Sequence, residues 1–158
     1  MAGAMETVLG CLSGVTYHTF DTVYDLVFTS ERVIAFIIQH PSDALEYPSM
    51  WETVATGRLM ARRREQHQRA ASAEARRLTL QEKTPAELLA AHPVNFEVRY
   101  SAVTSVEITR HLLQLQLVFD VSPSSATRRP VRFNLSKKHL ADARDLVDRA
   151  LAPKVKRK

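Results

Sequence analysis

Residues 94–151 constrain the fold of this chain more than any other segment. Four short stretches in it carry apolar side chains at every second position, and a fifth carries them at helical spacing. In the clearest stretch, residues 113–121, apolar residues alternate with Gln114, Gln116 and Asp120. A two-residue period is typical of a strand with one buried face. We therefore expect a small antiparallel sheet that is closed by a helix.

The other strands of this segment are expected at residues 96–100, 106–109 and 131–135. The helical stripe that follows is wide enough to cover one open end of a curled sheet. Its members are Leu140, Ala143, Leu146, Val147, Ala150 and Leu151. Ser136 is in position to cap this helix. Residues 152–158 form a basic tail, which we expect to be mobile from Lys154 onward.

The first forty residues predict further strands. Residues 23–30 and 32–39 are expected to pair as a hairpin. Residues 33–38 are apolar on both faces, which fits a strand that is covered on both sides. Residues 7–20 are rich in β-branched and aromatic residues. They predict either one strand interrupted by a serine and a glycine, or a strand followed by a loop.

Between the third and fourth main strands, residues 48–92 are predicted to be a helical insertion. Ser49 and Glu52 have the spacing of a capping box, in which each side chain satisfies a backbone amide of the first turn. Good helix formers without proline or glycine follow in the arginine-rich part of the insertion. We expect one long helix over about residues 50–80.

A short second helix is predicted at the end of the insertion. Thr84 and Glu87 repeat the capping-box spacing, and Pro85 stands at the first helical position, where its missing amide costs nothing. Leu88 and Leu89 then provide apolar side chains. We expect this helix to dock on the sheet.

Three passages of the sequence resemble prokaryotic pleckstrin-homology-like (PH-like) domains. VYDLVFTSERVIAFII is similar to their early hairpin, and VRFNLSKKHLADARDLVDRAL to their last strand and closing helix. NFEVRYSAVTSVEI is similar to a central segment of such domains, with Arg99 in place of a proline. The resemblance implies that residues 1–158 form a single PH-like barrel of about seven antiparallel strands, with a C-terminal capping helix and a long helical insertion. It indicates a fold rather than a function.

One property of that family does not carry over. PH domains that bind phosphoinositides use lysine and arginine around their first hairpin loop, and no lysine or arginine precedes Arg32 in this chain. A headgroup site of that type therefore has no candidate residues.

The sequence contains no pattern typical of an active site or a cofactor site. None of the six histidines has a second His or Cys at metal-ligand spacing, and no G-x-S-x-G, P-loop or G-x-G-x-x-G is present. The single cysteine, Cys11, lies among apolar residues and is expected to be buried. We therefore predict a chain that is not an enzyme and that holds no cofactor or metal.

The most distinctive candidate site is the start of the long insertion helix. Apolar residues at helical spacing lie beside an arginine run, namely Trp51, Val54 and Leu59 beside Arg58, Arg62, Arg63 and Arg64. Three interpretations fit this face. It packs on the chain's own sheet with its arginines in solvent, it associates with a second copy or a protein partner, or it enters an anionic membrane surface.

The formal net charge of +5 permits an acidic partner. However, no aromatic residues that would stack on bases are interleaved with the arginine run, which argues against nucleic acid. No apolar run approaches the ~20 residues that span a bilayer. We predict a cytoplasmic, non-catalytic interaction module that acts as a protein–protein or self-association scaffold. Peripheral binding to anionic membranes through the insertion helix is the alternative.

Overall fold

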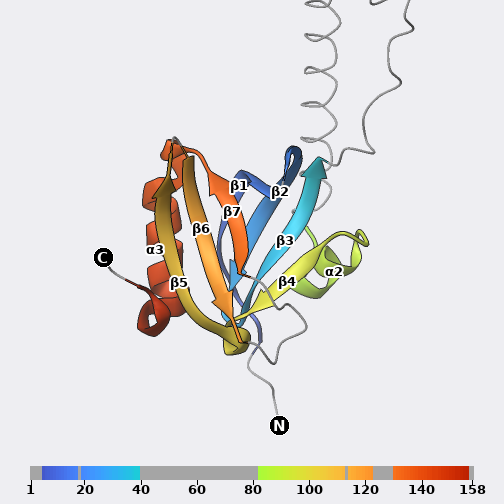
Figure 1. The fold of residues 1–158 in the computed structure, drawn as a ribbon. Coiled ribbons are helices and arrows are strands. Elements are labelled where there is room, and N and C mark those ends of the chain that lie inside the picture. The colour runs from blue at the N-terminus through green and yellow to red at the C-terminus, as the bar shows by residue number, and fades with distance from the viewer. Residues whose placement is uncertain (1–4, 18, 40–81, 113, 123–129, 157–158) are drawn as a thin grey trace, which may run out of the picture.

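The computed structural model describes residues 5–17, 19–39, 82–112, 114–122 and 130–156, and within them seven antiparallel strands form one sheet (Figure 1). The strands are β1 (Val8–Tyr17), β2 (Thr19–Thr29), β3 (Arg32–Gln39), β4 (Phe96–Arg99), β5 (Val103–His111), β6 (Gln114–Val121) and β7 (Val131–Leu135). Their order in the sheet is β4-β3-β2-β1-β7-β6-β5, so β4 and β5 are the edge strands. The prediction of a mainly β chain with seven antiparallel strands is confirmed.

β1 is one strand with an irregularity at Gly14. Gly14 has a φ of +72°, which glycine adopts without steric cost, and the register with β2 shifts between Leu12 and Val15. Such a shift is typical of a β-bulge, which bends the strand that carries it. Of the two alternatives for residues 7–20, the single interrupted strand is confirmed for Val8–Tyr17, whereas Thr19 already belongs to β2.

The β2–β3 hairpin is also confirmed, although β2 begins at Thr19 rather than at residue 23. Its turn is organised by the side chain of Thr29. The Thr29 hydroxyl accepts hydrogen bonds from the amides of Glu31 and Arg32, at 3.2 and 3.1 Å. A threonine hydroxyl in this position takes the place of a backbone acceptor and fixes the turn.

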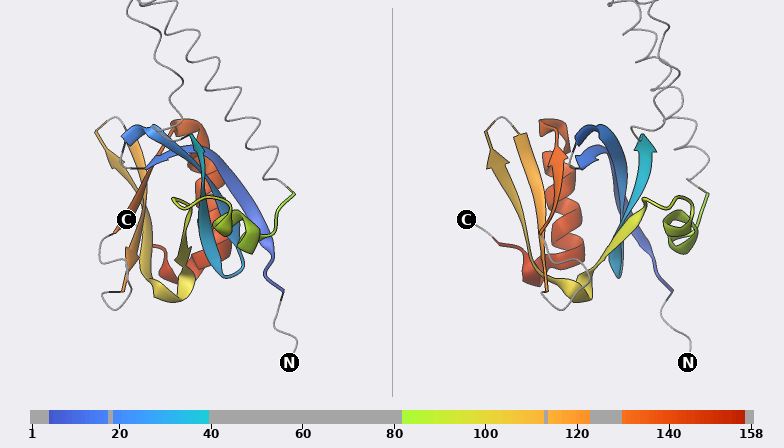
Figure 2. Two further views of the ribbon diagram at one scale, coloured as in Figure 1. Left: turned by 90° about the vertical axis from the view of Figure 1, so that its right-hand side faces the viewer. Right: turned by 45° about the vertical axis from the view of Figure 1, so that its right-hand side comes forward.

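The sheet is strongly curled (Figure 2). Phe96 on β4 stacks on Phe133 on β7, with ring centroids 5.9 Å apart. Three strands separate β4 from β7 in the sheet, so a flat sheet would hold these residues about 19 Å apart. The two halves of the chain therefore share one core, in which Phe28, Phe119 and Phe133 are fully buried.

The predicted C-terminal helix is present as α3 (Leu140–Leu151), which packs against the core of the curled sheet. The members of its apolar stripe that are buried are Ala143, Leu146, Val147 and Leu151. α3 also approaches β1 closely because Gly10 has no side chain. A Cβ atom at position 10 would lie 2.6 Å from Cδ2 of Leu146.

The start of α3 differs from the prediction. Ser136 precedes a 3₁₀ turn, η3 (Lys137–His139), and its side chain makes no capping hydrogen bond to the backbone. Ser136 Oγ lies 2.9 Å from Nδ1 of His139 instead. Because this turn intervenes, the α-helix begins only at Leu140.

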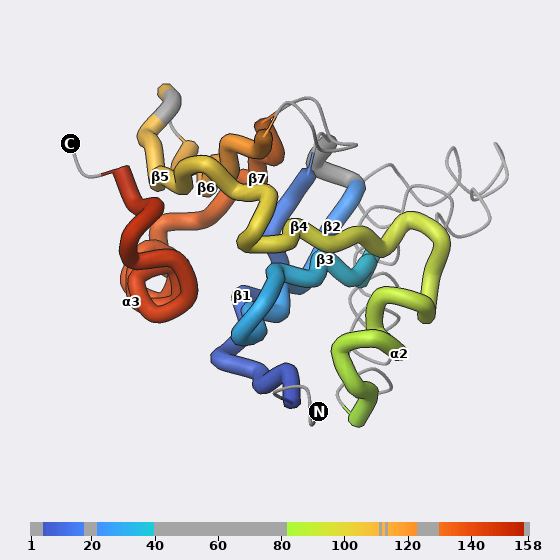
Figure 3. The backbone as a smooth tube through the Cα atoms, turned by 90° about the horizontal axis from the view of Figure 1, so that it is seen from below, coloured from blue at the N-terminus to red at the C-terminus, as the bar shows by residue number. Residues whose placement is uncertain are grey.

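α2 (Pro85–Ala90) packs on the outer face of the β2–β3 hairpin, whereas α3 packs on the inner face of the curled sheet (Figure 3). Ile34, Phe36 and Ile38 of β3 are buried in a separate cluster together with Leu88 of α2. The prediction that residues 33–38 form a strand covered on both faces is therefore confirmed. The prediction that a short helix docks on the sheet is confirmed as well.

One set of hydrogen bonds caps the start of α2, and a second set connects α2 to the sheet. The predicted capping box is confirmed, because Glu87 N donates to Thr84 Oγ1 at 3.3 Å and Thr84 N donates to Glu87 Oε2 at 2.7 Å. The buried side chain of Asn95 then connects α2 to β3. It donates to the carbonyl of Leu88 and accepts from the amide of Ile37, each at 2.7 Å.

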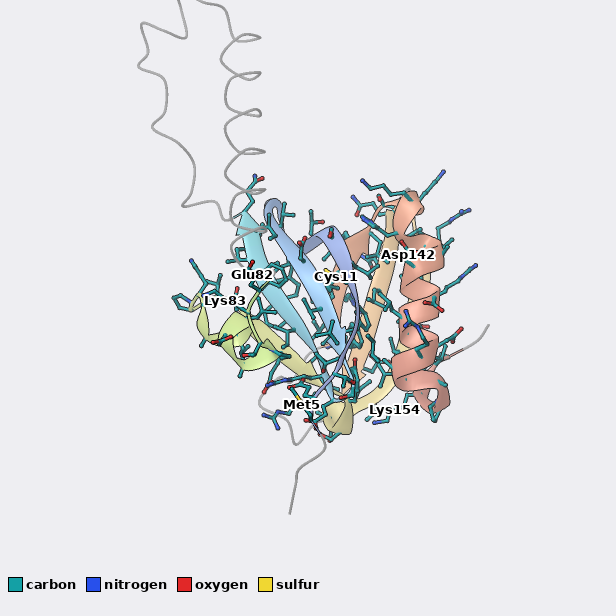
Figure 4. All side chains as sticks on the ribbon, turned by 180° about the vertical axis from the view of Figure 1, so that it is seen from behind. Met5, Cys11, Glu82, Lys83, Asp142 and Lys154 are labelled. Carbon is teal, nitrogen blue, oxygen red and sulfur yellow. The ribbon has the colours of Figure 1, made fainter. Side chains whose placement is uncertain are left out.

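The prediction that Cys11 is buried is wrong. Cys11 lies on β1 with its side chain exposed (Figure 4), whereas Leu12 and Val15 are buried in the core. Successive side chains of a strand point to opposite faces, so the inward position of Leu12 turns Cys11 outward. The apolar neighbours of Cys11 in the sequence therefore give no information about its burial.

Candidate functional site

A groove of about 580 Å³ lies between the edge strand β5 and the helix α3. β5 and α3 run side by side in Figures 1 and 2. Glu107, Ile108, Thr109 and Arg110 of β5 line one wall, and Arg144, Val147 and Asp148 of α3 line the other. Val155 and Lys156, which follow α3, line the groove as well. The site is thus built from one strand edge, one helix face and the segment after that helix.

The backbone of β5 presents hydrogen-bonding groups to this groove. In an antiparallel ladder, the N–H and C=O of one residue point to the same side, and the next residue points to the other. The carbonyl of Val106 accepts a hydrogen bond from the amide of Lys156, so Val106 faces away from β6. The register of β5 with β6 is regular from Ser105 to His111. The peptide groups of Ile108 and Arg110 therefore face the groove too.

In the described part of the chain, one contact pairs with this edge of β5. Val155 forms a parallel bridge with Val106, and Lys156 N donates to Val106 O at 2.9 Å. No described strand lies beside Ile108 or Arg110 on that side, since β5 ends the strand order. An open edge of this kind is a template for an added strand.

The prediction of a mobile tail from Lys154 is wrong for its first three residues. Lys154 ends the 3₁₀ turn η4 (Ala152–Lys154), lies just past α3 in Figure 4, and donates through Nζ to the carbonyl of Tyr100. Lys156 Nζ lies 3.1 Å from Oδ2 of Asp120 on β6. A hydrogen bond from Ser105, followed by this contact with Lys156, lowers the pKa of the Asp120 carboxyl despite its partial burial.

The side chains of the groove combine charge of both signs with an apolar floor. Glu107 and Asp148 are acidic, while the basic side chains come from Arg110, Arg144 and Lys156. Ile108 and Val147 pack against the core of the domain, Val147 being buried. This arrangement suits an extended polypeptide that places alternate apolar side chains inward and leaves polar ones at the rim.

The hairpin between β5 and β6 carries an exposed leucine, Leu112, two residues after Arg110 of the groove. Leu112 is 86 % exposed and has a φ of +54°. A side chain with a Cβ atom is strained in this left-handed region, by roughly 1–2 kcal/mol, and asparagine tolerates it best among non-glycine residues. Leucine is usually buried and has a negative φ, and Leu112 departs from both preferences.

We expect Leu112→Asn to raise the free energy of unfolding by about 0.5–1 kcal/mol, because asparagine relieves this strain. Urea denaturation measures the change as a higher midpoint at constant slope. Leu112→Ala is the matched control, since alanine removes the exposed apolar atoms but keeps the unfavourable Cβ. Equal stabilisation by both substitutions would contradict the explanation from backbone strain.

A second polar cluster lies at the β2–β3 turn. The Arg32 guanidinium contacts two carboxylates, that of Glu6 at 2.8 Å and that of Glu97. The hydrogen bond from Arg32 lowers the pKa of Glu6. Burial alone would raise the pKa of Glu97, but hydrogen bonds from Arg32 and Arg99 outweigh it and lower that pKa. Because these charges satisfy one another, the cluster is suited to fastening the chain before β1 rather than to binding a ligand.

His139 contacts the exposed Ser136 and is influenced by the charge of the buried Asp25, which brings together the residue types of a hydrolytic triad. His139 is 9 % exposed, and burial followed by the charge of Lys138 lowers its pKa, which favours the neutral ring. Its Nδ1 contacts Ser136 of the same turn, while the buried Asp25 accepts a hydrogen bond from the amide of Gly14. His139 also hydrogen-bonds to the backbone of Ser13 on β1, so its contacts join the η3 turn to β1 and have a structural role.

The site residues predicted from the sequence lie outside the described residues. They are Trp51, Val54, Leu59, Arg58, Arg62, Arg63 and Arg64, and all fall within residues 40–81. The predicted long helix over about residues 50–80 lies outside the described residues as well. Self-association or membrane binding through this face stays a prediction.

Sequence reasoning does not find the β5–α3 groove. The alternation of a strand shows which side chains are buried, but it does not show which strand ends the sheet. One local signal was available, because Val155 stands between Lys154 and Lys156. A charged–apolar–charged triplet has the two-residue alternation that is typical of a strand with one buried face.

Comparison of the chain with protein-family models, with curated proteins and with solved structures found no match. Within the described ranges, no helix is both long and apolar enough to cross a membrane.

Proposed function

We propose that this protein is a non-catalytic interaction module that takes an extended segment of a protein partner onto the open edge of β5. The observation that carries the proposal is the strand pairing already begun there, between Val106 and the segment at Val155 and Lys156. The peptide groups of Ile108 and Arg110 continue the same edge. Addition of one strand would pair them as a neighbouring strand does in a sheet.

The walls of the groove support this proposal. A strand on the edge of β5 would lie against α3, so its inward side chains would meet Ile108 and Val147. Main-chain hydrogen bonds would supply affinity, and the charged residues at the rim would select among sequences. Natural proteins usually protect long strand edges, so an edge left open beside a groove favours a partner.

The same geometry supports a PH-like barrel as the finer description of the fold. The seven antiparallel strands, the curl that brings Phe96 onto Phe133 and the C-terminal helix agree with what the resemblance implies. A barrel closed at one corner by α3 would place the edge of β5 next to that helix, where the groove lies.

Arg110→Pro tests the proposed function, because proline removes the outward amide of residue 110 without removing a hydrogen bond to β6. Proline is tolerated at edge positions of this kind. Random peptides displayed on phage are selected on the intact chain, and the selected peptides are measured by fluorescence anisotropy. We expect Arg110→Pro to weaken binding at least about tenfold.

Arg110→Ala is the matched control, since it removes the same side chain and keeps the amide. We expect the alanine variant to bind within about threefold of the unmodified chain. If the proline variant binds as tightly as the alanine variant, or if no peptide is selected, strand addition at this edge is wrong.

A further inference from the structure

We infer that the segment Lys154–Lys156 is a built-in ligand of the β5 edge, which competes with partner strands for the groove. The segment also defines the chemistry of such a partner: an aliphatic residue that pairs in parallel with β5 and has a lysine on either side. This inference rests on the proposed function and names the regulation and the ligand class of the same site.

The backbone contact of the segment is that of a strand partner. Val155 pairs with Val106 in parallel, and the hydrogen bond from Lys156 N to Val106 O is 2.9 Å long. A parallel strand that continued from this bridge would next face the peptide group of Ile108. The segment therefore occupies the inner end of the edge that a longer partner strand would use.

The side chains of the segment are recognised as well. Val155 is half-buried and packs against the main core. The two lysines are held on either side of it, Lys154 by the carbonyl of Tyr100 and Lys156 by the carboxylate of Asp120. An apolar contact flanked by two separate cation acceptors selects a lysine–aliphatic–lysine stretch over an acidic one.

Covalent attachment favours the segment over an identical stretch from another molecule. A tethered ligand experiences a high effective concentration at its own site, so a free peptide has to exceed that concentration to displace it. The described backbone contact of the segment with β5 is one bridge and one hydrogen bond, so a strand that also pairs with Ile108 and Arg110 would make more contacts and could replace it. A partner strand can therefore pair with Val106 only after the segment has dissociated from β5.

The test uses a full-length chain in which Val155→Glu and Lys156→Glu are combined, so that repulsion from Asp120 releases the segment. Nuclear magnetic resonance follows the backbone amides. We expect the amide at position 156 to exchange with solvent at least about tenfold faster, and the signals of residues 106–108 to move. Lys137→Glu is the control, because it reverses the charge of an exposed lysine outside the segment. It should change neither the exchange rate of the amide at position 156 nor the signals of residues 106–108.

The released chain is then titrated with the acetylated peptide Ala-Pro-Lys-Val-Lys-Arg-Lys, which has the sequence of residues 152–158. We expect the signals of residues 106–108 to return toward their original positions, while the unmodified chain responds at least about tenfold less at the same peptide concentration. A peptide with aspartate in place of the valine should not restore them. Lys156→Glu alone, at an exposed side chain, provides the same readout if the double variant unfolds.

Three results would overturn the inference: unchanged exchange at position 156 on release, equal responses of released and unmodified chains, or equal action of the aspartate peptide. Because this titration uses a peptide with the chain's own sequence, it gives a result even if phage display selects no foreign peptide. Failure of the proposed function and failure of the built-in ligand are thus distinguishable.

Discussion

Replacing Phe133 by alanine is expected to lower the free energy of unfolding by about 3–5 kcal/mol, because it opens a cavity where both halves of the sheet meet. The Phe133 ring is fully buried. Its centroid lies 5.4 Å from that of Tyr17, 5.9 Å from that of Phe96 and 6.3 Å from that of Phe119. Denaturant titration monitored by circular dichroism measures the loss.

Phe133→Leu is the control for this prediction. Leucine keeps much of the volume and should cost distinctly less than alanine, about 1–2 kcal/mol. A loss below about 1 kcal/mol for Phe133→Ala would mean that β4 and β7 do not share a core in solution, and the curled sheet would be wrong.

Arg32→Met is expected to lower the free energy of unfolding by about 2–4 kcal/mol at pH 7. Methionine keeps the length of the side chain but leaves the carboxylates of Glu6 and Glu97 close together and partly buried without their cation. Removing one partner from a buried ion pair costs ~3–5 kcal/mol, and partial exposure reduces that figure here. Arg99→Met is the matched control. Arg99 binds Glu97 from an exposed position, so its loss should cost only about 0.5 kcal/mol.

The effect of Arg32→Met should also depend on pH, with a sign fixed by the carboxyl groups. The pKa values of Glu6 and Glu97 are lowered in the folded protein. Their contribution to stability is therefore present above the ordinary glutamate pKa of about 4.5 and disappears as pH falls through the lowered values. The difference between the unmodified chain and Arg32→Met should shrink between pH 7 and about pH 3. A constant difference over that range would contradict the ion-pair explanation.

The parts of the fold that the sequence predicts are those with a local cause. Alternation in β6, the helical stripe of α3 and the capping box of Thr84 and Glu87 each involve residues close together in the chain. Burial on both faces of β3 is also visible as a continuous apolar run. A single sequence contains these signals because secondary structure and its periodicity act over a few residues.

The parts that the sequence does not predict depend on contacts between distant residues. Asn95 is buried because it serves both α2 and β3, and nothing next to it in the sequence indicates this role. Cys11 is exposed because of the alternation of β1, despite its apolar neighbours. The candidate site depends on the strand order that leaves β5 at an edge, and on Val155 reaching Val106. Such long-range pairings are decided by the whole fold.

Glycine at position 10 of β1 affects the groove on the opposite side of α3, between α3 and β5. Leu146 sits against Gly10, and Arg149 donates to the carbonyl of Leu9 at 3.2 Å, so the helix is seated on the β1 side. The spacing between α3 and β5 is thus governed by a strand that contributes nothing to the groove lining. A bulkier residue at position 10 would reposition the helix and alter the width of the opening while every wall residue stayed the same.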